Sequence, residues 1–159
     1  MINQWNSAIE NFIFLAAKHN VRMLMVGGAA VNFHGYQRHS ADVDFWIDTS
    51  KENFKKLIAV FQEMDYDIDD FPEAVKEKQQ NISVKFSPID LDLELITNFS
   101  VNKPFEDAYN ERETVSVLRN NKKLIWHVIS LDDLITSKIK SGRSKDLLDL
   151  QQLQKKRQK

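Results

Sequence analysis

The 159-residue sequence contains no cysteine, only four glycines and only three prolines. The absence of cysteine excludes a disulfide framework, a cysteine zinc site and a thiol nucleophile. No apolar run approaches the roughly 20 residues of a membrane-spanning helix, and the N-terminal stretch MINQWNSAIE lacks the basic start of a signal peptide. We therefore expect a cytoplasmic protein without a membrane partner.

The sequence also lacks an excess of charge of one sign. Lys and Arg number 22, Asp and Glu number 23, and the formal net charge is -1. This balance argues against a general nucleic-acid coat protein but leaves room for a local basic patch. The length and the hydrophobic content of 42% suit one domain with a sizeable core. With no internal repeat and no long linker, a single domain over residues 1–159 is predicted.

Hydrophobic periodicity predicts helices and strands in alternation. The predicted strands are residues 22–26, 42–47, 82–87, 89–96, 114–119 and 123–129. The predicted helices are residues 3–19, 29–35, a helix opened by the capping box Thr49–Glu52, a short helix starting at Pro72, and two C-terminal helices with Ser130 and Ser144 as N-caps. A tight Ser87–Pro88 turn is expected between two of the strands, and the C-terminal KKRQK is expected to fray.

Two aspartates, Asp42 and Asp44, stand one residue apart inside the stretch VGGAAVNFHGYQRHSADVDFWID. On a strand they point the same way, about 6.5 Å apart. At that separation two carboxylates repel by roughly 2–3 kcal/mol at an effective dielectric of ~20. A cation between them would offset the repulsion. An edge strand with a polar outer face is the alternative that the triplet alone leaves open.

A diglycine, Gly27-Gly28, stands where the strand 22–26 meets the next helix. Such a junction presents free backbone N–H groups without side chains to block an approaching phosphate. A tight turn is the structural alternative. Because the aspartate strand follows within one helix, the two features together favour a metal–triphosphate site.

The same stretch resembles the signature of the polymerase-β-like nucleotidyltransferase superfamily, in its minimal bacterial branch. The matching residues are Gly27, Gly28, His34, Gly35, Arg38, Ser40, Asp42 and Asp44. IDLDLELITNF is similar to the strand that bears the third carboxylate, and VISLDDLITSKIKSGRSKDLLDLQQL to the C-terminal segment. The likeness extends from about residue 20 to residue 153 and is greatest to nucleotidyltransferases related to abortive-infection (AbiEii-type) toxins.

This resemblance implies an α/β (α+β) fold with a mixed β-sheet flanked by helices. It implies Mg²⁺-dependent transfer of a nucleoside monophosphate from an NTP to an acceptor hydroxyl, with two ions held by Asp42, Asp44 and a third carboxylate. Gly27 and Gly28 would contact the β and γ phosphates. The acceptor would be a tRNA, a protein or a small molecule.

A further implication is a role as the toxin of a toxin–antitoxin pair, with an inhibitory antitoxin protein as partner. The alternative is a catalytically weak nucleotide-binding or protein-interaction module on the same fold. The short chain favours this alternative, because it leaves little room for an acceptor-binding domain.

The third carboxylate lies in the stretch IDLDLELIT. Asp90, Asp92 and Glu94 alternate with leucines, so they share one strand face and periodicity does not choose among them. The family pattern of an acid, an apolar pair and a hydroxyl fits Glu94 followed by Leu95, Ile96 and Thr97. Since the family usually has aspartate there, Asp92 stays open as the alternative.

Basic side chains concentrate near the junction of the last two helices: Lys138, Lys140, Arg143 and Lys145. A phosphate-bearing substrate needs such charge. A solvated helix face is the alternative, because Lys145 and Asp149 have the i,i+4 spacing of a surface pair. The resemblance favours Lys138 and Arg143 as nucleotide-binding residues, with Asp146 and Asp149 as their structural partners.

Three residues of the motif stay ambiguous or rest on the resemblance alone. Arg38 is a phosphate contact or an ion-pair partner of Asp44. Ser40 is a nucleotide-binding residue by resemblance. His34 is either a motif residue or a residue that caps or packs within its short helix.

Overall fold

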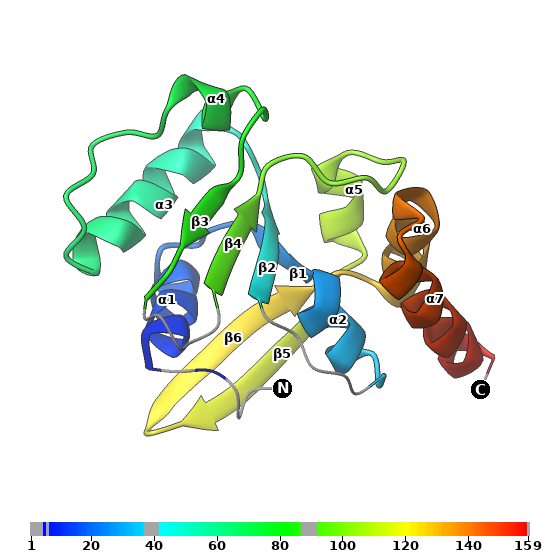
Figure 1. Ribbon diagram of the computed structural model, residues 1–159. Helices are drawn as coiled ribbons and strands as arrows, with labels where there is room; N and C mark the ends of the chain where they lie inside the picture. Colours follow the sequence, from blue (N-terminus) through cyan, green and yellow to red (C-terminus); the bar gives the residue numbers. More distant parts are fainter. Residues whose placement is uncertain (1–4, 6, 37–41, 87–91, 159) are drawn as a thin grey trace.

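The computed structural model describes residue 5 and residues 7–36, 42–86 and 92–158. The helices are α1 (Ser7–Lys18), α2 (Gly27–Phe33), α3 (Lys51–Glu63), α4 (Glu73–Lys76), α5 (Phe105–Asn110), α6 (Leu131–Ser141) and α7 (Ser144–Arg157). The strands are β1 (Met23–Val26), β2 (Asp42–Ile47), β3 (Ile82–Val84), β4 (Asp92–Ile96), β5 (Glu113–Arg119) and β6 (Lys122–Val128). They form one sheet in the order β3-β4-β2-β1-β6-β5 (Figure 1).

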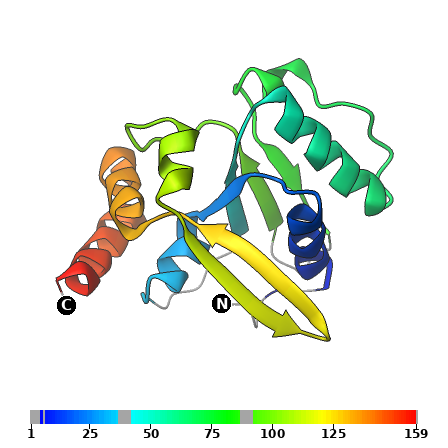
Figure 2. The ribbon, with the colours of Figure 1, turned by 180° about the vertical axis from the view of Figure 1, so that it is seen from behind.

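The sheet is mixed, as expected. β1 runs antiparallel to β2 and parallel to β6, and β2 runs parallel to β4. The β5–β6 hairpin turns at Asn120 and Asn121, whose positive φ angles of 50° and 65° suit asparagine. Figures 1 and 2 show α1 and α3 to one side of the sheet and α5, α6 and α7 to the other. The predicted fold class, a mixed sheet flanked by helices, is confirmed.

The neighbouring strands β2 and β4 have one apolar face and one face that carries the acidic residues. The residues of the apolar face are at most 1% exposed: Val43, Phe45, Leu93 and Leu95. The Phe12 ring of α1 lies 6.5 Å from the Phe45 ring and 5.7 Å from the Phe61 ring of α3. Since successive strand residues point to opposite faces, the aspartates of β2 face away from this core.

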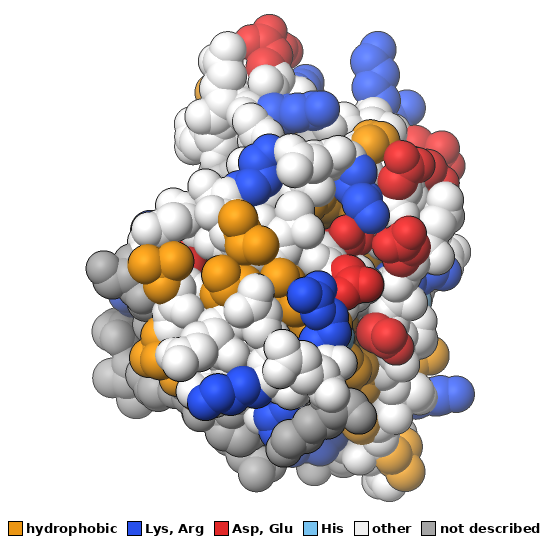
Figure 3. Space-filling model, turned by 90° about the vertical axis from the view of Figure 1, so that its right-hand side faces the viewer, with side chains coloured by type: hydrophobic (Ala, Val, Ile, Leu, Met, Phe, Trp, Pro, Cys, Tyr) orange, Lys and Arg blue, Asp and Glu red, His pale blue; other side chains and the backbone are white. Residues whose placement is uncertain are grey.

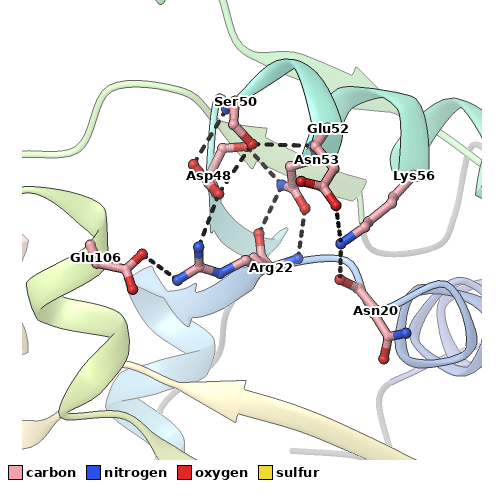
Figure 4. A network of polar contacts seen from close by, with 8 residues as sticks. All are labelled: Asn20, Arg22, Asp48, Ser50, Glu52, Asn53, Lys56 and Glu106. Carbon is pink, nitrogen blue, oxygen red and sulfur yellow. Dashed lines mark hydrogen bonds and ion pairs between the residues drawn. The ribbon is translucent and has the colours of Figure 1, made fainter.

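One buried amide joins the start of β1, the end of β2 and α3 (Figure 4). Asn53 is 1% exposed; its side-chain oxygen accepts the Arg22 N–H at 2.8 Å. Its NH₂ group donates to the carbonyl oxygens of Arg22 at 3.0 Å and Asp48 at 2.7 Å. The Arg22 guanidinium in turn pairs with Asp48 at 3.5 Å and with Glu106 of α5. These contacts fix the β1–β2 pair from which the acidic face projects.

Two predicted helix starts are wrong by one residue. The N-cap of α3 is Ser50 rather than Thr49, and its hydroxyl accepts the backbone N–H of Asn53 at 3.2 Å. The N-cap of α7 is Arg143 rather than Ser144, and it makes no side-chain cap hydrogen bond. Sequence alone does not separate neighbouring residues that can each precede a helix.

The C-terminal tail is helical rather than frayed. α7 continues to Arg157, whose guanidinium lies 3.3 Å from the Asp132 carboxylate of α6. Basic residues in a last turn also favour a helix, because they complement its negative end. The expected Ser87–Pro88 turn and the start of the first helix at residue 3 lie outside the described residues. Within the described ranges, no helix is long and apolar enough to cross a membrane.

Candidate active site

Four carboxylates form two rows on neighbouring strands. The parallel β2–β4 pairing places Asp42 beside Asp92 and Asp44 beside Glu94. Side chains paired this way project to the same face of a sheet, and residues two apart do so as well. All four residues are partly buried. The chain therefore brings both predicted metal-binding aspartates and both candidates for the third carboxylate to one face.

The two candidates for the third carboxylate differ in their surroundings. The Ser83 hydroxyl of β3 donates to the Glu94 carboxylate at 2.7 Å. The Oδ1 atom of Asp92 is buried and receives no hydrogen bond from the described residues, and Lys85 Nζ lies 3.8 Å from it. Glu94 is the neighbour of Asp44, and Asp92 the neighbour of Asp42, so both remain candidates. Asp90 lies outside the described residues.

Gly27 lets the backbone approach the acidic face closely. Val26 pairs with Asp44 across the β1–β2 ladder, so Gly27 follows directly beside that aspartate. Gly27 has φ +65°, and a Cβ atom added to it would lie 2.5 Å from Asp44 Oδ2. A Cβ at that distance would force the Asp44 carboxylate to move, and the positive φ angle independently favours glycine here. Gly28, the next residue, is buried in the first turn of α2.

A cavity of about 310 Å³ collects four of the predicted site residues: Gly27, Asp44, Lys138 and Arg143. They come from the β1–α2 junction, from β2, from α6 and from the start of α7. The sequence interpretation missed other lining residues, which include Asn81, Asn98, Phe99, Ser100, Ser137 and Ser141. Five of these six residues had a signal in the sequence. Ser137 and Ser141 have the i,i+4 spacing of one helix face beside Lys138, and residues 98–100 follow β4 directly.

The basic residues of the cavity are held by buried aspartates. Lys138 is 5% exposed, and its Nζ lies 2.9 Å from Asp146 and 3.2 Å from Asp149. Arg143 Nε lies 2.6 Å from Asp146, while the Arg143 side chain is 61% exposed. Burial alone would raise the pKa of Asp146, but hydrogen bonds from Arg143, Ser141 and Lys138 hold that pKa well below its usual range. The expected structural pairing of both aspartates with these bases is confirmed.

Other motif residues lie apart from this cavity or outside the described residues. A ring nitrogen of His34 hydrogen-bonds the Ile129 carbonyl oxygen at 2.8 Å, which favours the packing interpretation of this histidine. Lys140 contacts Asn102 through its amine. Arg38 and Ser40 lie outside the described residues.

The outer side of α6 and α7 carries apolar side chains. Figure 3 shows this side of the molecule, with hydrophobic side chains gathered among Lys and Arg. The exposed large hydrophobics of the two helices are Ile139, Leu147 and Leu148, which are 55%, 55% and 51% exposed. The same helix pair thus supplies ion-paired charge to the cavity and apolar surface to the solvent.

The donor chemistry of the acidic face fits magnesium, since Mg²⁺ takes carboxylate oxygens. The buried Oδ1 of Asp92 accepts no hydrogen bond from the described part of the chain, so it is a further oxygen that a cation can contact. As the side chains stand, no three residues of the metal-binding types gather closely enough within the described ranges to hold an ion. The strands therefore bring the carboxylates to one face, but within the described residues their oxygen atoms do not surround a common point.

The sheet order, the glycine beside Asp44 and the carboxylates on adjacent parallel strands agree with the fold that the resemblance to nucleotidyltransferases implies. The chain belongs to the family described as "Nucleotidyltransferase of unknown function (DUF6036)", which matches residues 7–155. No curated protein sequence matches the chain.

One similar solved structure is the crystal structure of an antigenic nucleotidyltransferase-like protein from Paracoccidioides brasiliensis. The two chains are 16% identical and superpose with a TM-score of 0.50, over 92% of this chain and 73% of the other. At this identity the likeness shows the fold alone.

Proposed function

We propose that this chain is a Mg²⁺-dependent nucleotidyltransferase that moves a nucleoside monophosphate from an NTP to an acceptor hydroxyl. The observation that supports it is the cavity of about 310 Å³ shared by Gly27, Asp44 and Arg143. Bare backbone, a carboxylate and a guanidinium are the groups that a metal-bound triphosphate requires, and here they come from three distant segments.

Asp42, Asp44 and Glu94 are the proposed magnesium ligands, for two ions. Bound magnesium would neutralise the charge of the triphosphate and of the departing pyrophosphate. Gly27 and Gly28 form the proposed contact for the β and γ phosphates, because no side chain at Gly27 keeps them from the backbone.

Glu94 is also the proposed proton acceptor. The acceptor hydroxyl oxygen forms a bond to the α-phosphorus, the bond from that phosphorus to the bridging oxygen breaks, and pyrophosphate leaves. The hydroxyl proton passes to the carboxylate. Asp92 is the alternative for this role, one same-face position away.

Arg143 is better suited than Lys138 to touch phosphate. The Arg143 side chain is 61% exposed beside the cavity, whereas the Lys138 amine is enclosed by two carboxylates. We assign Lys138 to the same nucleotide site as a residue that fixes Asp146 and, through it, the Arg143 guanidinium. Arg38 and Ser40 complete the proposed nucleotide contacts.

The acceptor and the biological role rest on the sequence resemblance. Likeness to AbiEii-type toxins supports a tRNA or protein acceptor and a toxin role, with an antitoxin protein as inhibitory partner. A small-molecule acceptor is compatible with the same chemistry. Growth of cells that express the wild-type chain or Asp44→Asn tests the toxin role: growth arrest only by the wild type supports it.

A second candidate function is a nucleotide-binding module with little catalysis. It is favoured by the absence, within the described residues, of three converged metal ligands. The hydrogen bond from the Ser83 hydroxyl to Glu94 also favours this second function, because it engages the carboxylate that would accept the proton.

Calorimetry with a nonhydrolysable NTP tests the proposed binding site. We expect affinity to require Mg²⁺ and to fall about tenfold or more in Asp42→Asn and Asp44→Asn, since a hydrogen bond or ligand bond to a charged group contributes ~1.5–3 kcal/mol. Asp107→Asn, the same change at an exposed position of α5, should leave affinity unchanged. Unchanged affinity in both site variants would exclude the metal-site assignment.

Transfer is tested by incubation with each α-labelled NTP, Mg²⁺ and total cell RNA or lysate. Label on an acceptor supports the enzyme, and binding without transfer supports the module. Glu94→Gln should keep NTP binding and lose transfer, while Asp92→Asn should keep most of the transfer activity. The reverse result would move the catalytic assignment to Asp92.

A further inference from the structure

The lining of the cavity beside Asp44 includes two groups of residues. One group is charged and includes Asp44, Lys138 and Arg143. The other group is uncharged and consists of Ile96, Asn98, Phe99 and Ser100, from the end of β4 and the segment after it. We call these two parts of the lining the charged end and the uncharged end. A nucleoside triphosphate has the same division, between an anionic polyphosphate and an uncharged base.

A second cavity, of about 190 Å³, adjoins the uncharged end, because Asn98 and Phe99 line both cavities. Its other walls include the aromatic side chains Trp46 and Phe105. The Trp46 ring lies 5.4 Å from the Phe99 ring and 5.1 Å from the Phe105 ring. Aromatic side chains, together with Lys78 and Lys103, therefore line a cavity that adjoins the predicted phosphate site.

The strand geometry agrees with this order. Asp44 and Trp46 are two residues apart on β2 and share a face, so about 6.5 Å separates the acidic row from the aromatic row. A nucleotide with its phosphates beside Asp44 and its base beside Trp46 would thus lie along the direction of β2.

The segment after β4 is firmly anchored but exposes its next residues. Thr97 is 3% exposed; its hydroxyl donates to the Gln80 carbonyl oxygen at 3.0 Å, and its N–H donates to Asn81 Oδ1 at 3.1 Å. Asn98 is exposed and Phe99 is partly buried. A fixed backbone thus presents an amide and an aromatic ring to the cavity.

We propose that Asn98 and Phe99 form the base-binding subsite of this protein and select a purine nucleotide. Phe99 stacks on the base, and the larger face of a purine gains more from stacking. The Asn98 amide offers a donor and an acceptor side by side, which match the N6 and N7 edge of adenine. This inference rests on the proposed function, because it assumes that the triphosphate occupies the charged end.

Two probes separate the base subsite from the phosphate site: nonhydrolysable ATP and inorganic tripolyphosphate, each titrated with Mg²⁺ by calorimetry. Phe99→Leu keeps apolar bulk but loses the aromatic face, and Asn98→Ala removes the amide at an exposed position. We expect each variant to bind the ATP analogue about tenfold more weakly and tripolyphosphate equally well. Asn110→Ala, an exposed asparagine of α5 that lines neither cavity, should change neither affinity.

Each other outcome has a distinct meaning. Unchanged binding of the ATP analogue in both variants would overturn the subsite, and so would an equal loss of both probes. Equal affinity of the wild type for purine and pyrimidine analogues would overturn the purine preference. Wild-type protein that binds neither probe would refute the proposed function itself.

Discussion

The close approach of Gly27 to Asp44 allows a quantitative test of the site by Gly27→Ala. The substitution forces alanine into the left-handed region at φ +65°, which costs roughly 1–2 kcal/mol. The new Cβ would also lie 2.5 Å from Asp44 Oδ2, so that carboxylate must leave its rotamer, at about 0.5–1.5 kcal/mol more. The expected loss in free energy of unfolding is therefore about 1.5–3.5 kcal/mol.

A double-mutant cycle with Asp44→Ala isolates the clash. Without the carboxylate, the nearest atom of residue 44 to the new methyl group is its Cβ at 3.5 Å, an ordinary contact. Gly27→Ala should then cost only the backbone strain, which gives a coupling energy of about 1 kcal/mol between the two positions. Equilibrium unfolding in urea, without divalent metal, measures all four proteins.

The chain contains a matched control. Gly142 has φ +63°, but a Cβ added there meets nothing within 4 Å. Gly142→Ala should therefore cost about 1–2 kcal/mol from backbone strain and show no coupling to Asp44→Ala. If Gly27→Ala cost no more than Gly142→Ala, and cost the same with and without Asp44, the close approach would be refuted.

Three further outcomes are expected. Asn53→Ala should cost about 2–4 kcal/mol in urea unfolding, because three backbone groups lose their partner, whereas Ser50→Ala removes one cap and costs about 1 kcal/mol; similar losses would contradict this. The lowered pKa of Asp146 stabilises the fold above about pH 4, and this stabilisation is lost as pH falls through the lowered value. In urea unfolding, Asp146→Asn should therefore be less stable at pH 7, and its free energy of unfolding should depend less on pH below about pH 4. Burial, with Arg112 nearby, lowers the pKa of His127, so stability should fall as pH drops below about 6.5, and a His127→Gln variant that keeps the full slope would contradict this.

Local pattern predicted the elements that carry the acidic face. The strand expected at residues 42–47 has those bounds, because alternating apolar and acidic side chains determine both its period and its two faces. The diglycine was expected at a strand-to-helix junction, and Gly27 lies there. The bounds of this strand and the position of the diglycine depend on residues that are adjacent in the sequence, so a single sequence is enough to predict them.

The sequence did not reveal contacts between distant segments. Nothing local states that Asp42 pairs with Asp92 and Asp44 with Glu94, because the offset between two strands is set by the whole sheet. The pairing of Lys138 with Asp146 and Asp149 was expected, but the near-complete burial of the Lys138 amine between the two helices was not. The Asn98–Phe99 wall was missed for the same reason, since its importance comes from Trp46 beneath it.

The alternation along β2 and β4 limits how this protein can change over generations. A slip of one residue between these strands would turn Leu93 and Leu95 to the acidic side and send carboxylates into the core. The core therefore enforces the position of the acids, while the acids contribute little to the core. A descendant can lose Asp42 or Asp44 and keep its shape, but moving either acid by one residue along the strand would place a carboxylate in the core. The acidic face can therefore be lost by single substitutions that leave the core intact, whereas a shift of the acids by one residue cannot leave it intact.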